Sequence, residues 1–160
     1  TFLMFLVQGV KLRSPQGLVS MIVPDTLTIN DSYEATRRYL TSSGICRIAR
    51  LDFAVFSGPT VRTTIPVCGP ATGSVRLMVY DTKSSVETKC PISETEVPIS
   101  IILDRRACKW LFSSLSVQNL LSKIECPSIP LEAIAETRDG VNPGPRSFRA
   151  RILGQVPDFL

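Results

Sequence analysis

The sequence predicts an all-β fold, an antiparallel sandwich or barrel with one or two short helices. Its 160 residues fit a single domain, 1–160, and 44% of them are hydrophobic and 20% charged, which is typical of a chain with a packed core. Apolar and polar residues alternate with period two in several segments, and proline or glycine separates these segments. Many short strands between turns indicate a sandwich or barrel rather than a sheet with crossover helices.

The strongest alternation lies in two segments, 45–56 and 74–81. In the second, Val75, Leu77 and Val79 alternate with polar or longer residues, so one face of this strand suits a core. Proline cannot donate to a strand ladder, and we expect the prolines at strand ends. Further strands are expected at 18–23, 60–65, 99–103, 108–113 and 148–153, with a weaker one at 131–136.

Two segments show helical spacing instead. Asn30 and Asp31 are favourable N-cap residues before a helix expected at 33–40. Ser116 begins a second segment, 116–124, in which apolar residues recur every three or four positions. We expect both to be short helices beside the sheets.

The first sixteen residues are expected to form an N-terminal arm. Its apolar run, 2–7, is far shorter than the ~20 residues that cross a bilayer, and it lacks the basic flank of a signal peptide. We therefore expect no membrane association, and we interpret the run as a strand or an arm that docks on a neighbouring subunit. The candidate contact residues are Phe2, Leu3, Phe5 and Leu6.

Several kinds of chemistry find no support in the sequence. The chain has no histidine, which removes His-dependent triads and His-ligated metal sites, and its five cysteines form no C-x-x-C pair. Such cysteines indicate free, mostly buried thiols in a reducing compartment. The paired carboxylates Glu94 and Glu96 are expected in an exposed loop, and Trp110 in the core. We expect no enzyme, no cofactor and no metal.

The charge balance is mildly basic. Eighteen lysines and arginines against 14 acidic residues give a net charge of +4, which neither demands nor forbids an anionic partner. The basic residues occur as scattered pairs rather than as one basic arm. Any nucleic acid would be held by weak, salt-sensitive and sequence-independent contacts. The candidates are Arg37, Arg38, Arg105, Arg106 and Lys109.

A short helix leads into the glycine and strand at 39–45, the long strand ends at 53–58, and Gly73 opens the next strand at 73–80. This order of features resembles the jelly-roll capsid proteins of picorna-like viruses. The segment 147–160 is similar to the last jelly-roll strand, with a trailing Pro-x-Phe, of small plant viruses of the comovirus and cheravirus kind. The resemblance extends over 17–82 and 146–160.

This resemblance implies a jelly-roll subunit of an icosahedral virus shell that encloses RNA. The partners would be identical or related capsid subunits and genomic RNA, and the location the virion, with the host cytoplasm during assembly. Capsid proteins of this group are released from a polyprotein, which agrees with a chain that begins at Thr1. The family has no active site, so the resemblance implies no catalytic or metal-binding residue.

Two other hypotheses stay open. The stretch 47–83 is also similar to the core of plant-virus movement proteins of the thirty-kilodalton superfamily, in which an aspartate follows such a strand; Asp81 is the matching residue. That resemblance implies binding of single-stranded nucleic acid. A lectin-like β-sandwich that binds glycans is the third hypothesis.

Overall fold

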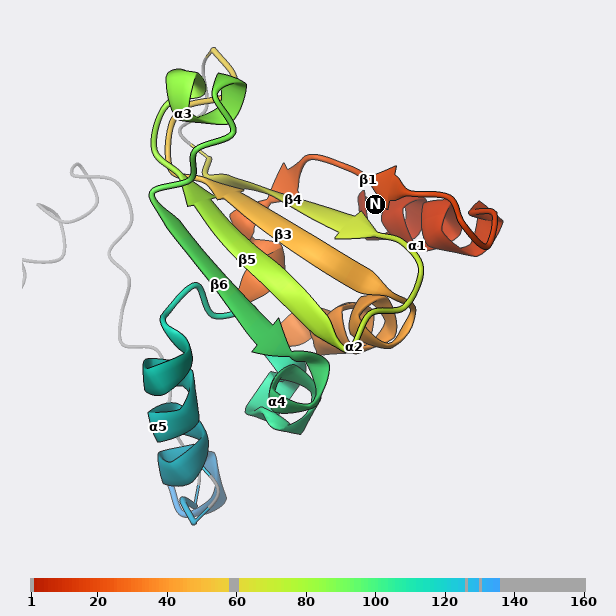
Figure 1. Cartoon of the computed structure of the whole chain (residues 1–160). Helices are drawn as coiled ribbons and strands as arrows, with labels where there is room; N and C mark the ends of the chain where they lie inside the picture. Colours follow the sequence, from red (N-terminus) through yellow and green to blue (C-terminus); the bar gives the residue numbers. More distant parts are fainter. Residues whose placement is uncertain (1, 58–60, 126, 130, 136–160) are drawn as a thin grey trace, which may run out of the picture. The chain divides into compact units, whose positions relative to one another are not determined.

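The computed structural model describes residues 2–57, 61–125, 127–129 and 131–135. It shows one six-stranded sheet with the order β1-β4-β3-β5-β6, in which β2 also pairs with β4 (Figure 1). Strands β3 and β5 pair in parallel, and helices pack on the sheet, so the predicted all-β jelly roll is wrong. The chain divides into two units, Thr1–Pro127 and Ser128–Leu160, and each is described by itself.

The strands of the first unit are short. Strand β4 is antiparallel to β1, β2 and β3, and β6 is antiparallel to β5. The alternating segments at 45–56 and 74–81 are confirmed as β3 and β5, although β3 ends five residues earlier than the alternation does. The strands are β1 (Val19–Ser20), β2 (Val23–Pro24), β3 (Ile45–Leu51), β4 (Thr63–Cys68), β5 (Ser74–Tyr80) and β6 (Ser93–Pro98).

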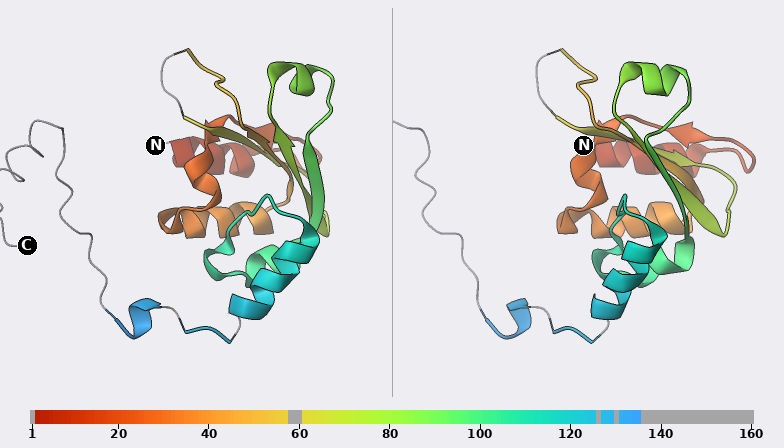
Figure 2. Two further views of the ribbon diagram at one scale, coloured as in Figure 1. Left: turned by 90° about the vertical axis from the view of Figure 1, so that its left-hand side faces the viewer. Right: turned by 60° about the vertical axis from the view of Figure 1, so that its left-hand side comes forward.

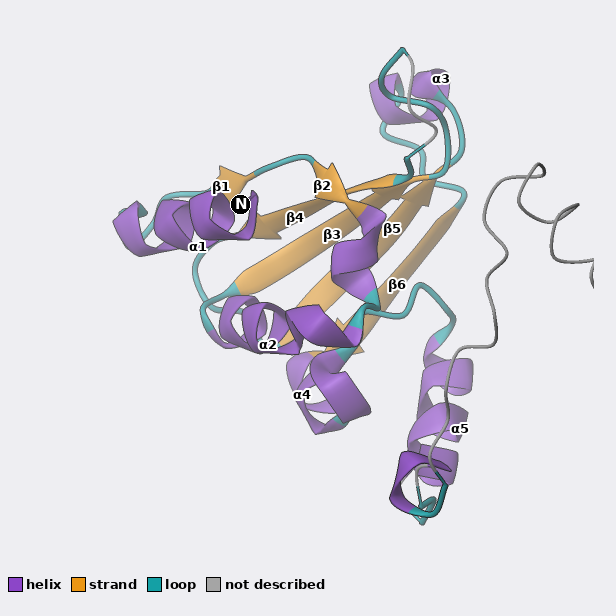
Figure 3. Ribbon diagram, turned by 180° about the vertical axis from the view of Figure 1, so that it is seen from behind, coloured by secondary structure: helices purple, strands orange, loops and turns teal. Residues whose placement is uncertain are grey.

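The helices α1, α2 and α4 lie over one face of the sheet (Figure 3). The predicted helices at 33–40 and 116–124 are confirmed as α2 and α5. The α-helices are α1 (Phe2–Leu12), α2 (Glu34–Ser42), α3 (Lys83–Glu87), α4 (Ile99–Asp104) and α5 (Leu115–Glu125), and the 3₁₀ turns are η1 (Asp25–Thr28), η2 (Asp31–Tyr33), η3 (Arg106–Cys108) and, in the second unit, η4 (Leu131–Ala133). Across the described residues, every helix is too short or too polar to cross a bilayer.

The N-terminal arm is a helix packed on the core of its own chain, which corrects the prediction of a strand or docking arm. Leu6 is fully buried, and Leu3 is partly buried against the core. The ring of Phe2 meets that of Tyr33 edge to face at 5.9 Å between centroids. Of the four predicted contact residues, only Phe5 is exposed. An unbroken apolar run hides the helical period, which is why the sequence did not reveal this helix.

Four other strand predictions fail or lie outside the described residues. The segment 99–103 lies in α4, because a short apolar run has no period that separates strand from helix. The segment 108–113 forms no ladder, and 131–136 contains the η4 turn. The strand expected at 148–153 lies outside the described residues. Conversely, Glu94 and Glu96 lie on the edge strand β6 rather than in a loop.

Pro66 is an exception to the expectation that prolines mark strand ends. It lies inside β4 and pairs with Ile48 of β3. On the other side of β4, β1 pairs with residues 67–68 and β2 with residues 63–64, so no ladder partner lies opposite Pro66 there. A proline is tolerated where one side of a strand makes no ladder hydrogen bond.

The core lies between the sheet and the helices that cover it. Trp110 is fully buried, as predicted, and its Nε1 donates to Thr41 Oγ1 at 3.2 Å. The four cysteines among the described residues are free thiols, of which Cys68 and Cys108 are buried. Burial, with the nearby Cys46, raises the pKa of Cys68 to about 11. The largest fully buried apolar side chains are Leu6, Leu27, Leu40, Ile45, Ile48, Leu77, Ile102 and Trp110.

Candidate functional site at the carboxyl edge of the sheet

Strands β2, β3 and β5 run in one direction and end at the same edge of the sheet, here called the carboxyl edge. An aspartate directly follows each of them: Asp25, Asp52 and Asp81. The loops after β3 and β5 both rise from this edge (Figure 2). In open α/β sheets, ligands bind outside the carboxyl ends of the strands. The edge is therefore the part of the fold where a site is expected.

Arg50 and Asp52 form a bidentate ion pair at this edge. Arg50 Nε lies 3.0 Å from Asp52 Oδ1, and Nη2 donates to Oδ2 at 3.0 Å. The guanidinium also lies 4.8 Å from the ring centroid of Phe112, within cation–π range. The backbone N–H of Asp52 donates to the Tyr80 carbonyl at 2.8 Å. One hydrogen bond, the ion pair and the contact with the Phe112 ring hold the guanidinium in place, so the start of the loop after β3 is fixed.

Asp25 lies half-buried next to this pair. Its backbone N–H donates to the Arg62 carbonyl at 2.9 Å, which joins the start of η1 to the end of the loop before β4. Burial raises the pKa of Asp25, the charge of Arg50 opposes the rise, and Asp52 adds to it. The edge thus carries both signs of charge, and one of its carboxyls binds a proton more readily than a free aspartate does.

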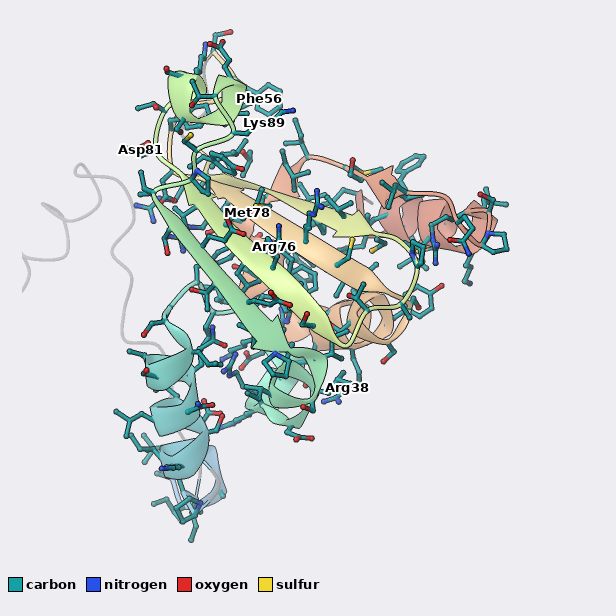
Figure 4. All side chains as sticks on the ribbon, viewed as in Figure 1. Arg38, Phe56, Arg76, Met78, Asp81 and Lys89 are labelled. Carbon is teal, nitrogen blue, oxygen red and sulfur yellow. The ribbon has the colours of Figure 1, made fainter. Side chains whose placement is uncertain are left out.

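An exposed aromatic ring stands in the loop that this ion pair anchors. Phe56 is 56% exposed, and Figure 4 shows it above the ends of β3 and β5. A hollow of about 160 Å³ lies at the base of the same loop. It is lined by Asp52, Phe53, Ala54, Val61 and Arg62. An exposed ring in a loop whose base holds a small hollow with apolar and charged lining can stack on a planar ligand.

Two of the predicted nucleic-acid contacts are structural instead. Arg37 is fully buried, and its guanidinium donates to the carbonyls of Leu27, Asn30, Ala107 and Cys108. Arg105 is 3% exposed and donates to the Lys109 carbonyl and to Gln118 Oε1, each at 3.1 Å. A phosphate could reach neither guanidinium without breaking the core. Arg37 and Arg105 therefore have a structural role rather than one in nucleic-acid binding.

The other three predicted contacts are nearer the surface. Arg38 pairs with Glu34 at 2.9 Å, and Lys109 pairs with Asp31 at 2.9 Å. Arg106 is exposed on η3. The structure brings these residues together around α2 and η3, away from the loops that follow β3 and β5. Arg38 accordingly lies at the opposite end of the molecule from Phe56 in Figure 4.

Sequence reasoning missed most of the carboxyl edge. Asp81 was singled out, and it is exposed directly after β5. The repeated order of apolar strand and aspartate, at Asp25 and Asp52 as well as Asp81, was the available signal. The carboxylates considered as a catalytic pair have other partners: Glu94 pairs with Arg76 at 3.1 Å, and Glu96 accepts from Ser74 Oγ. Within the described ranges, no cluster of three potential ligands could hold a metal ion.

The fold and the edge define a mixed α/β domain that carries charged and aromatic side chains at the carboxyl edge of its sheet. No family model matches the sequence, and no curated protein matches it either. Among solved structures, the chain is similar to one described as "Structural basis underlying complex assembly and conformational transition of the type I R-M system", with a TM-score of 0.53 and 13% identity. The match covers 98% of this chain and 40% of that chain, so this chain spans two fifths of its length. The likeness concerns the fold alone.

Proposed function

We propose that this chain is part of a DNA-contacting α/β domain of the restriction–modification kind, and that its carboxyl edge contacts a nucleobase. The observation that carries the proposal is the exposed ring of Phe56 in a loop anchored at the carboxyl ends of β3 and β5. The fold likeness to a chain in a structure of the type I R-M system is the reason for choosing DNA as the ligand to test.

The geometry of the loop fits base stacking. The Arg50–Asp52 pair fixes where the loop begins, and the hydrogen bond from Asp25 to the Arg62 carbonyl fixes where it returns to the sheet. Phe56 is therefore presented from a fixed base. Stacking of one base on an aromatic ring contributes about 1–3 kcal/mol and tolerates any base.

The charges of the edge set the strength of backbone contacts. Arg62 lies in the loop before β4, the exposed Lys83 begins α3, and the exposed Lys89 follows that helix; Asp52 and Asp81 lie at the same edge. Because the signs are mixed, few phosphates can be neutralised, and the affinity should fall only gently with salt. Stacking rather than charge would then carry most of the binding.

The test compares two exposed phenylalanines. A fluorescein-labelled single-stranded DNA oligonucleotide is titrated with the chain, with Phe56→Ala and with Phe5→Ala, whose ring is 69% exposed on α1. We expect Phe56→Ala to weaken binding about 5- to 100-fold, Phe5→Ala to leave it within about twofold, and Phe56→Trp to retain it. Equal behaviour of the two alanine variants, or no binding by the parent chain, would contradict the proposal.

The virus hypotheses stay predictions. The capsid hypothesis has lost the jelly roll on which it rested, because the sheet is mixed and covered by helices. The movement-protein hypothesis shares nucleic-acid binding with the present proposal but is carried only by the sequence resemblance. Sedimentation of the purified chain separates the capsid hypothesis from the others, since only capsid subunits form closed, uniform particles.

A further inference from the structure

The face of the sheet opposite the helices is open. Figure 1 looks onto this face, and no described helix lies over β3, β4 and β5 there. Arg76 and Met78 point outward from it (Figure 4). Strand register places the following residues on the open face: Arg47 and Ala49 of β3, Ile65 and Val67 of β4, Arg76 and Met78 of β5, and Glu94 and Glu96 of β6.

The centre of the open face is apolar. Ile65, Ala49 and Met78 are adjacent in the register of three neighbouring strands and are only half-buried. The sheet is mostly antiparallel, and such sheets commonly leave one face to solvent. Charged residues of β3, β5 and β6 border the apolar row on this face. A half-buried apolar centre with a charged rim is the arrangement of a protein–protein interface.

A hollow of about 380 Å³ lies beside this apolar row. Leu18, which is 68% exposed, and Pro70 form part of its wall, and Arg47 and Arg76 lie side by side in it as register partners on parallel strands. The remaining lining residues are Cys46, Val67, Thr72, Ser74 and Glu96.

The two arginines differ in their partners. Arg76 Nε lies 3.1 Å from Glu94 Oε1. Arg47 is exposed, and its side chain makes no hydrogen bond or ion pair within the described part of the chain. The hollow thus holds one guanidinium without an ionic partner beside the apolar side chains of Leu18 and Pro70, while the carboxylate of Glu96 in the same wall accepts from Ser74 Oγ. The complement of that guanidinium is a carboxylate on an apolar surface.

We propose that the open face binds an amphipathic α-helix of another polypeptide, with its apolar side on Ile65, Val67 and Met78 and one carboxylate against Arg47. The seven-residue strands span roughly 23 Å, which matches a helix of about 15 residues. Helices with residues at i, i+3, i+4 and i+7 spacing bind such surfaces. This inference stands on the open face and is independent of the nucleobase contact.

The first experiment exchanges charges across the interface. The probe is a fluorescein-labelled helical peptide of about 16 residues, with leucines at that spacing and a single central glutamate, and its control carries lysine there. We expect the parent chain to prefer the glutamate peptide about tenfold, Arg47→Glu to reverse the preference, and Arg38→Glu, the same charge change away from this face, to leave it unchanged. Absence of binding, or a preference that ignores residue 47, would overturn the proposal.

The second experiment needs no variant. Cys46 lines the hollow, whereas Cys90 is exposed in the segment between α3 and β6. The glutamate peptide should slow alkylation of Cys46 severalfold and leave Cys90 unchanged; equal rates with and without peptide at both thiols would contradict docking on this face. Self-association that protects Cys46 without peptide would assign the face to a second copy and would also overturn the proposal. Phe56→Ala should leave peptide binding intact, so this test and the DNA test can fail separately.

Discussion

Arg37 Nη2 donates to the carbonyl oxygen of Ala107 at 2.7 Å and so ties the middle of α2 to η3, seventy residues later in the chain. Ala107 has φ 54°, in the left-handed region that non-glycine residues seldom adopt. The same guanidinium bonds to the carbonyls of Leu27 and Asn30. One buried cation thus holds a strained turn and joins η1, η2 and η3.

Replacing this guanidinium should cost much stability. Arg37→Lys keeps the charge but cannot form the fork of hydrogen bonds, so buried carbonyls lose their donors. We expect the free energy of unfolding to fall by about 3 kcal/mol or more in urea titration. Arg38→Lys, next in sequence but exposed, should change it by less than about 1 kcal/mol. Equal losses of unfolding free energy in the two variants would show that the buried hydrogen bonds of Arg37 do not cause the loss.

Gly44 is a second position where the backbone restricts the side chain. Its φ is 101°, and a Cβ there would clash with the Gly69 carbonyl oxygen. Gly44→Ala should lower the free energy of unfolding by at least about 1–3 kcal/mol. Gly73→Ala is the matched control, because a Cβ there meets nothing within 4 Å. Calorimetric melting of both variants tests whether only Gly44→Ala is destabilised. Equal melting temperatures for Gly44→Ala and Gly73→Ala would contradict this prediction.

Asp25 should make stability depend on pH. Burial raises its pKa in the folded chain above the ~3.9 of an unfolded aspartate, so the folded state binds the proton more tightly. The stabilisation that the folded chain gains from protonated Asp25 is complete below the unfolded pKa, and it is lost as the pH rises through the folded pKa. Asp25→Asn should therefore gain stability over the parent at about pH 7 and show no such gain at about pH 3. Urea titrations of both chains at the two pH values test this. If Asp25→Asn were more stable than the parent only at the lower pH, the raised pKa of Asp25 would be contradicted.

The sequence predicted elements with a clear period and missed those without one. Strands β3 and β5 were found because β-branched and polar residues alternate in them. Helices α1 and α4 consist of continuous or short apolar runs, which fit either period. The parallel pairing of β3 with β5 has no signature in the sequence of either strand. It arises because β4 pairs antiparallel on one side of β3, and the chain then crosses from β4 to β5 on the other side.

The candidate site was still harder to predict. Asp25, Asp52 and Asp81 share an edge only because three strands run in one direction, which is a property of the topology. Arg37 and Arg38 look alike in the sequence, yet the helix turns Arg37 to the same buried face as Leu40 and Thr41. That i, i+3, i+4 phase was readable and would have removed Arg37 from the nucleic-acid candidates.

Photo-cross-linking tests the proposed nucleobase contact most directly. A single-stranded DNA oligonucleotide that carries 5-iodouracil is bound to the full chain and irradiated, and the cross-linked peptide is mapped by mass spectrometry. The account predicts that the cross-link falls on Phe56 and is lost in Phe56→Ala. A cross-link confined to α1, α5 or the surface around Arg38, with none in the loop after β3, would contradict it.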